Sequence, residues 1–498
     1  MENLRFTPLE ASELREKTKK LLTGFTNFFL FGFFCLGIVL GRSFPSFLTY
    51  LLFSFCFITG FLVFHKKNKS FVSEILLLLF FLSLGGLWYV SSRSDIDSFL
   101  HKESEITLKV ISLPGEKSTG NTFRAQIKAV DSHSTGIKAK VIDATRRLEY
   151  LNTYKFKAKL AKRKYKGRSF YSLWVKSGTP VKELPLGFFD SVAKKTSNYI
   201  LGVFRKYCWP QSYRFLGSVF LGRRELLSGE KEAFSNAGVS HLLAISGLHI
   251  GLTCLILFFV LRFFNIRFRA SLIISLVFLY FYTFLTGASF STLRAAIMYS
   301  VFAFSFLLKR KTHLLNSLAL AGFIIVLVEA EAIFNIGFQL SLTSVLGIIL
   351  GFKIFKIRTL KNPALNYIKQ MFFCSLFVTL FITPLISYYF GKLYIFSIFY
   401  NVVLIPFFTF ILGVNFLLLI FSPITFIGQS LGVLLSLFIR HFIRLISFFG
   451  EFRFSYLEFS FGLENVYIYY AFLTGILLIF TVRKVAISSK YLEKTAYI

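Results

Sequence analysis

Long apolar runs dominate this chain and constrain its fold more than any other feature. Each run is long enough, or nearly so, to cross a hydrocarbon core of about 30 Å at about 1.5 Å per residue. Because 55% of the residues are hydrophobic and 16% are charged, a water-soluble enzyme could not bury the apolar surface. The sequence therefore predicts a polytopic α-helical membrane protein of about twelve spans. The runs lie at about 21–41, 46–64, 71–90, 242–262, 270–286, 290–308, 314–330, 333–352, 370–388, 394–420, 425–448 and 464–482.

Basic loops alternate with these runs and predict the orientation. Lysines and arginines cluster between the second and third runs and after four of the later ones, and all these loops fall on one side if every run spans. The positive-inside rule assigns that side, and both termini, to the cytoplasm. The run at 425–448 carries Arg440, His441 and Arg444, so a position in the membrane interface is its alternative.

Cysteine usage and the N-terminus exclude other classes. The five cysteines form no C-x-x-C and no pairing pattern, so the sequence predicts no disulfide framework, no metal site and no cofactor. The first apolar run is too long for a signal peptide, and we expect it to remain as a membrane anchor.

The composition changes between residues 92 and 190. Segments at 106–111, 123–127, 137–142 and 154–160 alternate apolar and polar residues with the period of a β-strand. Four or five short strands in about 80 residues predict a small barrel of the OB type. The loop charges place this inserted domain on the extracytoplasmic side.

Five regions follow from these patterns. They are a three-span membrane region at 1–91, the OB-like domain at 92–190, an amphipathic helical connector at 191–240 suited to the membrane surface, a multi-span domain at 241–482 and a cytoplasmic tail at 483–498.

Two histidines stand at the entrance of the fourth apolar run. His241 and His249 are eight residues apart, so in one continuous helix they share a face. Gly247 and Gly251 have the spacing that lets a neighbouring helix approach closely. Ser246 has a base nearby but no acid and no nucleophile elbow, which makes a serine nucleophile a weak hypothesis. A packed helix with satisfied histidines is the equal alternative.

Arg294 is the only basic residue well inside the central runs at 270–308. A charged side chain within a span costs about 2.5–3.5 kcal/mol on insertion scales and usually faces a cavity or a pathway. Thr286 ends the run at 270–286, Gly287 follows it, and Ser291 lies with Arg294 near the start of the run at 290–308. A place on a translocation path is the favoured interpretation, and snorkelling to the outer interface is the alternative.

Polar residues and prolines also interrupt the later runs. Gln339 and Ser341 lie in one run, Pro384 in the next and Asn401 in the one after. Proline breaks helices and frees backbone carbonyls, which is tolerated where protein or a water-filled cavity satisfies them. These residues fit interhelical hydrogen bonds and a pore lining equally well.

Taken together, the three segments resemble the ComEC family, the inner-membrane channel of natural transformation. The order and spacing are similar to the family's competence domain over about 210–420, and the β domain is similar to its extracytoplasmic OB-like domain. The resemblance implies a channel, not an enzyme, that carries single-stranded DNA across the bacterial inner membrane into the cytoplasm. The matching residues are Leu221-Gly222 with Arg224; Ala237-Gly238 through His249 and Gly251; Thr286-Gly287, Ser291, Arg294, Ala295 and Met298; Asn316 and Leu318-Ala319; Phe338 to Ser341; Pro384 and Tyr389 to Gly391; and Asn401 with Pro406.

Two departures from the family matter. Gly222-Arg223-Arg224 stands where the family often has Gly-Asp-Arg, so no acidic contribution is expected there. Many members continue into a metallo-β-lactamase-like domain to which nuclease activity is attributed, but this sequence has no H-x-H-x-D-H cluster. We therefore expect no nuclease activity, and a separate nuclease becomes an expected partner.

The β domain carries the charge that a polyanion would require. Residues 92–190 hold 20 lysines and arginines against 10 acidic residues. Positive charge follows phosphates, and aromatic rings stack on any base, as in sequence-independent single-strand binding. A solvated basic face beside anionic lipid or cell-wall polymer is the alternative. The candidate DNA-binding residues are Lys155, Lys157, Lys162, Arg163, Lys164, Tyr165, Lys166, Arg168, Phe170 and Trp174.

The sequence has no P-loop, so the energy for transport must come from outside the chain. The expected partners are single-stranded DNA, membrane lipid, a DNA receptor on the outer face, and a cytoplasmic ATPase or single-strand-binding protein. Two other classes stay open: a transporter of another solute or lipid, and a membrane-embedded enzyme acting on an envelope substrate through His241, Ser246 and His249. The basic domain favours a polyanion, and the lack of an acid near His249 disfavours the enzyme.

Overall fold

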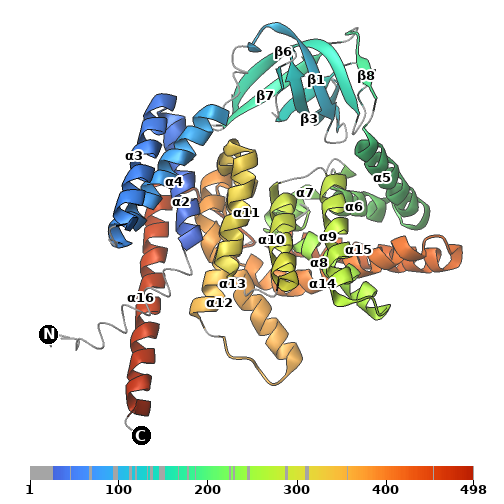
Figure 1. The fold of residues 1–498 in the computed structure, drawn as a ribbon. Helices are drawn as coiled ribbons and strands as arrows, with labels where there is room; N and C mark the ends of the chain where they lie inside the picture. The colour runs from blue at the N-terminus through green and yellow to red at the C-terminus, as the bar shows by residue number, and fades with distance from the viewer. Residues whose placement is uncertain are drawn as a thin grey trace.

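The structure, a computed structural model, combines many apolar helices with one small β-barrel (Figure 1). Apolar runs fold as helices because lipid offers no partner to a backbone N–H or C=O group, so each segment must satisfy its own. The residues described are 26–496 without 45, 67–69, 93–98, 111–114, 118–119, 132, 135–137, 145–147, 149–151, 166–167, 177–178, 186, 224–225, 228–229, 244–246, 287–289, 309–312, 356 and 453.

Three helices lie before the barrel and pack against one another. They are α2 (Thr26–Ser43), α3 (Phe47–Lys66) and α4 (Ser70–Ser92). Gly37 of α2 and Gly85 of α4 lie directly against the backbone of the other helix, where a side chain would collide. Tyr89 then donates a hydrogen bond to Glu331 at 2.8 Å, which joins this unit to the later helices.

Residues 103–184 form the barrel. Its strands are β1 (Glu103–Val110), β2 (Gly115–Lys117), β3 (Gly120–Val130), β4 (His133–Ser134), β5 (Lys138–Asp143), β6 (Thr153–Tyr165), β7 (Arg168–Val175) and β8 (Lys182–Leu184). Five of them pair in the closed order β1-β3-β5-β7-β6-β1, with β5 and β7 parallel. Alternate residues point inward, and Ile106, Leu108 and Val110 of β1 are fully buried. The four predicted strand segments overlap β1, β3, β5 and β6.

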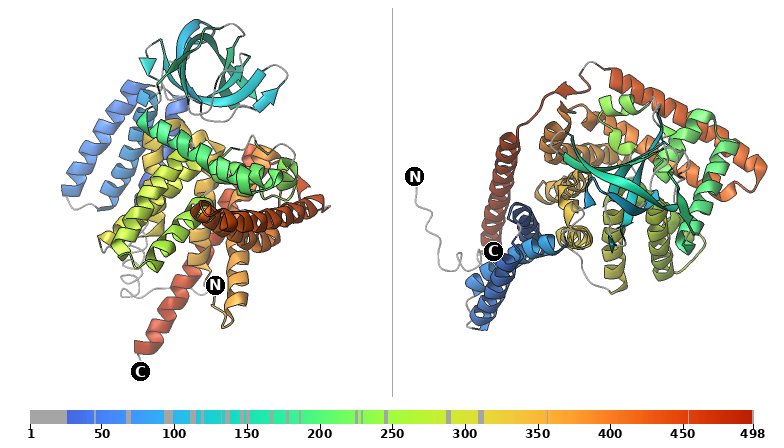
Figure 2. Two further views of the ribbon diagram at one scale, coloured as in Figure 1. Left: turned by 90° about the vertical axis from the view of Figure 1, so that its right-hand side faces the viewer. Right: turned by 90° about the horizontal axis from the view of Figure 1, so that it is seen from above.

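Two long amphipathic helices form a layer beneath the barrel. The chain leaves the barrel through α5 (Phe188–Tyr207), α6 (Pro210–Leu221) and α7 (Lys231–Asn236), which pack on α15 (Thr425–Glu451). Figure 2 (left) shows α5 and α15 lying across the molecule, below the barrel. Gly428 and Gly432 of α15 admit Tyr207 so closely that a methyl group on either would overlap it.

The remaining helices complete the membrane part. They are α8 (Gly247–Phe263), α9 (Phe268–Leu285), α10 (Phe290–Leu307), α11 (Leu314–Val328), α12 (Ile336–Ile354), α13 (Pro363–Phe390), α14 (Ser397–Phe421) and α16 (Leu463–Ala496), with the 3-10 helices η3 (Ser240–Leu242) and η4 (Ala330–Phe334) and a two-stranded sheet of β9 (Lys392–Leu393) and β10 (Leu457–Glu458).

Helix α10 belongs to two apolar cores at once. Ala296 is buried in the core that α5 to α9, α14 and α15 share, whereas Ile297 is buried in the core of α2, α4, α11 and α12. The barrel lies over the first of these halves, to the side of α2 to α4 (Figure 2, right). Helix α10 therefore stands at the junction of the two halves.

The predicted count of about twelve spans is wrong. Among the described residues, six helices are long and apolar enough to cross a membrane (α4, α9, α12, α13, α14 and α15). In four other apolar helices (α2, α3, α8 and α11), the fully described apolar stretch is shorter. The run at 242–262 is divided, because η3 precedes α8. With 15 residues, α11 is about 22 Å long, which is less than the hydrocarbon thickness of about 30 Å.

The expectation that proline breaks the later helices is also wrong. Helix α13 continues through Pro384, and α14 continues through Pro406. In α13, the hydroxyl of Tyr469 donates to the carbonyl of Leu380, which the missing N–H of Pro384 leaves without a helical partner.

Candidate functional site

Arg294 lies in the second turn of α10 and is buried. Its side chain is 4% exposed, and its Nε and Nη1 atoms have no hydrogen-bond partner. Among the described residues, no carboxylate forms an ion pair with it. A buried guanidinium without an anionic partner is costly, so this position needs an explanation beyond packing.

The guanidinium lies beside the beginning of α8. A methyl group placed on Gly247, the first residue of α8, would be 3.5 Å from the Nη2 atom of Arg294. The first N–H groups of a helix have no partner within it, and that end carries partial positive charge. The guanidinium of α10 therefore packs beside the first residue of α8.

His249 lies two residues further along α8. It is 1% exposed, and its ring lies edge-on to Phe408 of α14 at 4.6 Å between centroids. Its backbone carbonyl accepts a hydrogen bond from Thr253 at 2.7 Å. The side chain is therefore a component of the core between α8 and α14.

The prediction that the two histidines share one helical face is wrong. His241 is exposed and belongs to η3, whereas His249 belongs to α8. Gly238, with φ of 72°, turns the chain after α7 and packs under the ring of Tyr394. The two histidines therefore lie in separate elements, η3 and α8, rather than in one long helix.

The sequence predicted that a neighbouring helix packs against both Gly247 and Gly251 of α8, and this is correct for Gly247 alone. Gly247 lies against Ala295 and Arg294 at an ordinary contact distance, but nothing lies within 4 Å of a methyl group on Gly251. Gly251 is exposed and has open space where its methyl group would lie.

The polar residues of the later runs form hydrogen bonds between helices. Gln339 of α12 accepts a hydrogen bond from Tyr389 of α13 at 2.9 Å and donates one to the carbonyl of Ile333. Asn401 of α14 donates to Ser375 of α13 at 3.0 Å, while its buried Oδ1 atom has no partner. Interhelical bonding thus accounts for both residues.

A junction that the sequence analysis missed joins three distant segments. Lys392 donates a hydrogen bond to Asn236 at 3.2 Å and lies 3.7 Å from the ring centre of Tyr456. Ser387 donates to the carbonyl of Phe459 and accepts from the N–H of Phe461. The neighbouring motif Tyr389 to Gly391 marked the region, but its partners are too far away in sequence to be found by spacing.

Arg223, at the departure from the family pattern, is also buried. It is 6% exposed, and its Nη2 atom donates to Ser197 of α5 at 2.6 Å. Gly222 ends α6 with φ of 72°. Arg223 therefore links α5 to the end of α6, a contact that an aspartate is too short to make in the same way.

The barrel contacts the helical part at α5 and at the end of α9. Lys109 of β1 forms an ion pair with Asp190 of α5 and lies 5.2 Å from the ring centre of Phe284, at the end of α9. Lys194 of α5 donates to Asn152 at 2.9 Å. Since α10 begins a few residues after Phe284, the barrel is held close to the segment that carries Arg294.

The basic strand β6 divides into two parts. Lys155 and Lys157 point away from the barrel interior, but Lys155 pairs with Glu105 at 2.8 Å, and Lys157 lies opposite the same residue. Lys162 lies further along, opposite Tyr171, with its Nζ atom 5.7 Å from the ring centre. The positive charge near β1 is partly neutralised, and the distal part of β6 and β7 is the stronger anion-binding candidate.

The other candidate residues are placed as follows. Trp174 is 49% exposed on β7. Arg163, Lys164 and Tyr165 pair in β6 with Phe170, Ser169 and Arg168 of β7. Ser291 lies in the first turn of α10, Thr286 bonds to the carbonyl of Thr283 at 3.1 Å, Ser341 is half-buried in α12 and Pro384 is buried in α13. Ser246, Gly287 and Lys166 lie outside the described residues.

Comparison of the sequence with known protein families identifies the family of this chain. Residues 219–484 match the family described as "Competence protein", and this region is just over half of the 498 residues. The chain belongs to the competence protein family. The ComEC resemblance is thereby confirmed, and Arg294, His249, Gln339 and Asn401 all lie inside the matched region.

The competence-family chain is also similar to the ComE operon protein 3 of Bacillus subtilis (strain 168). The two are 32% identical over 182 residues, which is 36% of this chain. The match covers 23% of the length of that relative. No solved structure matches the chain.

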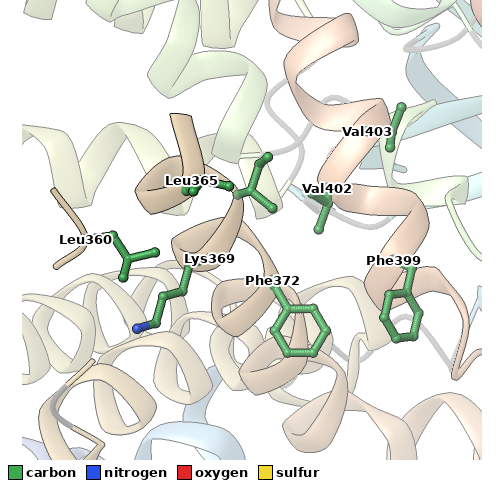
Figure 3. A pocket seen from close by; sticks show the side chains of 8 residues that line it. Leu360, Leu365, Lys369, Phe372, Phe399, Val402 and Val403 are labelled. Carbon is green, nitrogen blue, oxygen red and sulfur yellow. The ribbon is translucent and has the colours of Figure 1, made fainter. Parts of the chain in front are cut away.

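The competence-family chain has an open apolar pocket away from Arg294. It has a volume of about 390 Å³ and lies between α13 and α14, where Figure 3 shows Phe372 and Phe399 side by side on its wall. Its one charged lining residue, Lys369, donates to the carbonyl of Arg358 at 3.2 Å. Binding pockets normally combine an apolar wall with several placed polar groups, so this pocket is the weaker candidate site. Among the described residues, no group of three His, Cys, Asp or Glu side chains could hold a metal ion.

Proposed function

We propose that this competence-family protein carries single-stranded DNA across the bacterial inner membrane during natural transformation. The observation that supports this most is the buried Arg294, whose Nε and Nη1 atoms have no hydrogen-bond partner, inside the family region and close to where the basic barrel is attached. A cation in that position suits an anionic strand that passes between the two halves of the helical part. The energy comes from a partner, such as a cytoplasmic ATPase or single-strand-binding protein, or from the proton gradient.

The barrel is the proposed first contact with DNA. Its closed five-strand architecture agrees with an OB-type domain, a class that binds oligonucleotides. Lys162 and Tyr171 lie opposite each other on β6 and β7, and Trp174 is exposed on the other face of β7, so the barrel surface offers both charge and aromatic rings for single-strand binding. A DNA receptor on the outer face would deliver the strand to this surface.

The proposed orientation places the barrel outside the cell. Helix α16 runs to the side of the molecule opposite the barrel (Figure 1), and Arg483 and Lys484 lie within it. Basic residues prefer the cytoplasmic side. We retain the five regions, 1–91, 92–190, 191–240, 241–482 and 483–498, as the proposed functional division.

An envelope enzyme receives less support. His241 and His249 lie in different elements, and His249 is buried against Phe408. A general base must lie within hydrogen-bond reach of the proton that it removes, and an enclosed ring on Phe408 is poorly placed for that role.

Transformation assays test the proposed function. In a competent host, Arg294→Ala and His249→Ala should abolish DNA uptake while DNA still binds the cell surface and the protein still inserts. Arg262→Ala, which removes an exposed arginine from the other end of α8, is the matched control and should transform normally. Normal transformation in the Arg294→Ala strain would contradict a path through this site.

A binding assay on the full protein tests the barrel. Replacing Lys162, Lys164 and Lys166 by glutamine should weaken oligothymidylate binding. The slope of the logarithm of the binding constant against the logarithm of the salt concentration should become shallower by about 0.7 for each phosphate that the variant no longer neutralises. The same replacement of Lys155, Lys157 and Lys159 removes equal charge from the side facing Glu103 and Glu105 and should have the smaller effect. Equal effects would refute the assignment of the distal side.

A further inference from the structure

We propose that the apolar groove between α13 and α14, together with the basic loop before α13, binds one anionic phospholipid molecule. An acyl chain lies along the groove, and the phosphate of the headgroup contacts Lys369. This site goes beyond the proposed function and does not depend on DNA transport.

The groove supplies the apolar half of the site. It has a volume of about 390 Å³, and every lining side chain except Lys369 is apolar. Leu365, Phe399 and Val403 are each at least half exposed. A hydrocarbon chain would cover these side chains, whereas a polar small molecule would find one charged group and no other polar side chain. The lining therefore suits a lipid better than a soluble ligand.

Lys369 supplies a charge at one end of the groove. Figure 3 shows its nitrogen atom on the side away from Phe399 and Val403. An ammonium group has three N–H donors, and the carbonyl of Arg358 accepts one of them at 3.2 Å. Two donors are left for phosphate oxygens. An apolar wall with a cation at one end matches the shape of an amphiphile.

Hydrogen bonds hold the preceding loop against α13. The N–H of Leu360, which lines the groove, donates to the side chain of Asn366 at 3.0 Å. Asn362 caps α13 and accepts two of the first N–H groups of that helix, so an anion is left to the basic side chains. The same loop carries Arg358 and Lys361, which are thereby kept near the groove.

The charge around the groove is uniformly positive. The segment 353–369 holds five lysines and arginines, and residues 332–450 contain no aspartate or glutamate. Among the described residues, no carboxylate forms an ion pair with Arg358, Lys361 or Lys369. Basic pockets between transmembrane helices bind the headgroups of anionic lipids. Figure 1 shows the loop between α12 and α13 on the side of the helical part opposite the barrel, where a headgroup would lie.

Native mass spectrometry of the full protein in a neutral detergent tests the site. The probe is phosphatidylglycerol, and phosphatidylcholine with the same acyl chains is the comparison. Wild type should bind phosphatidylglycerol more tightly. Lys369→Gln should weaken phosphatidylglycerol binding by about fivefold, the effect of one basic residue near a membrane surface. Arg262→Gln is the matched control, because Arg262 also donates to a loop carbonyl, and it should bind like wild type.

A second variant tests the apolar half and guards against misfolding. Val403 is 50% exposed, so the ring of Val403→Phe can occupy the groove without displacing a buried side chain. The unfolding temperature without added lipid should stay unchanged, while phosphatidylglycerol binds several-fold more weakly. Val277→Phe, at an exposed position of α9, is the matched control and should change neither quantity.

Three results would overturn the proposal. The first is equal binding of the two lipids by wild type, which would remove the role of the charge. The second is unchanged phosphatidylglycerol binding in both Lys369→Gln and Val403→Phe. The third is Lys369-dependent binding of oligothymidylate or an acidic peptide without Lys369-dependent lipid binding, which would assign the basic loop to another partner. None of these measurements involves transport, so such a failure leaves the proposed function untouched.

Discussion

At the scale of the residue, Pro384 shows how a membrane helix compensates for a missing donor. Proline has no N–H, so the carbonyl four residues earlier, that of Leu380, loses its helical partner. Tyr469 of α16 donates its hydroxyl to this carbonyl at 2.9 Å. Tyr470 donates to the next carbonyl, that of Phe381, at 2.8 Å. The proline therefore acts as a docking point for α16.

A double-mutant cycle measures this contact. Tyr469→Phe should lower the free energy of unfolding by about 1 kcal/mol, because it leaves the Leu380 carbonyl without a donor. In a Pro384→Ala background, the restored N–H supplies that donor, so Tyr469→Phe should cost much less. Thermal unfolding in detergent gives the four values, and additive effects would show that the two residues act independently.

At the scale of the element, pairs of glycines four residues apart decide how closely helices approach. Gly347 and Gly351 of α12 lie against Phe377, and Gly428 and Gly432 of α15 lie against Tyr207. The same spacing in α8 predicts a close contact that forms only at Gly247. Spacing marks a helix face without a steric barrier, and a neighbour must still be present to use it.

Substitution in α15 distinguishes a used glycine from an unused one. A methyl group on Gly432 would overlap the backbone of Tyr207, so Gly432→Ala should destabilise the protein by about 1–3 kcal/mol through overpacking. Gly413→Ala in α14 meets nothing within 4 Å and should be neutral or stabilising by up to about 1 kcal/mol. Unfolding temperatures in detergent provide the test, and equal losses would argue against a steric cause.

At the scale of the whole molecule, one ion pair helps to hold the barrel over the helices. The Lys109 and Asp190 side chains are 12% and 13% exposed, so water screens them weakly. Lys109 also lies over the ring of Phe284 at the end of α9. Barrel, α5 and α9 therefore meet at a single residue, which sets the position of the barrel relative to α10.

Charge exchange tests this attachment. Asp190→Lys places two ammonium groups together and should release the barrel, seen as faster proteolysis between the barrel and α5 and lower DNA uptake. The double variant Lys109→Asp with Asp190→Lys restores opposite charges and should recover most of both properties. Persistent release in the double variant would mean that the pair does not hold the barrel.

Many of the strongest predictions came from patterns within single segments. Hydropathy predicted the membrane class, alternation predicted four of the five barrel strands, and Arg294 stood out because a charge in an apolar run is costly. The predictions that failed all depended on where one segment meets another. His241 and His249 separated because η3 ends at Leu242 and α8 begins at Gly247, and the span count fell because only six helices are long and apolar enough over their described residues.

The sequence by itself therefore determined the membrane class, the barrel, the family and the unusual buried charge, since each is encoded in local composition, period or motif order. Only the tertiary structure decided that Arg294 lies beside the first residue of α8, that Tyr469 completes the helix at Pro384 and that the barrel is attached above α9. These contacts join residues from 47 to 175 positions apart. Contacts at such separations follow from how the helices pack, and spacing along the chain carries no record of them.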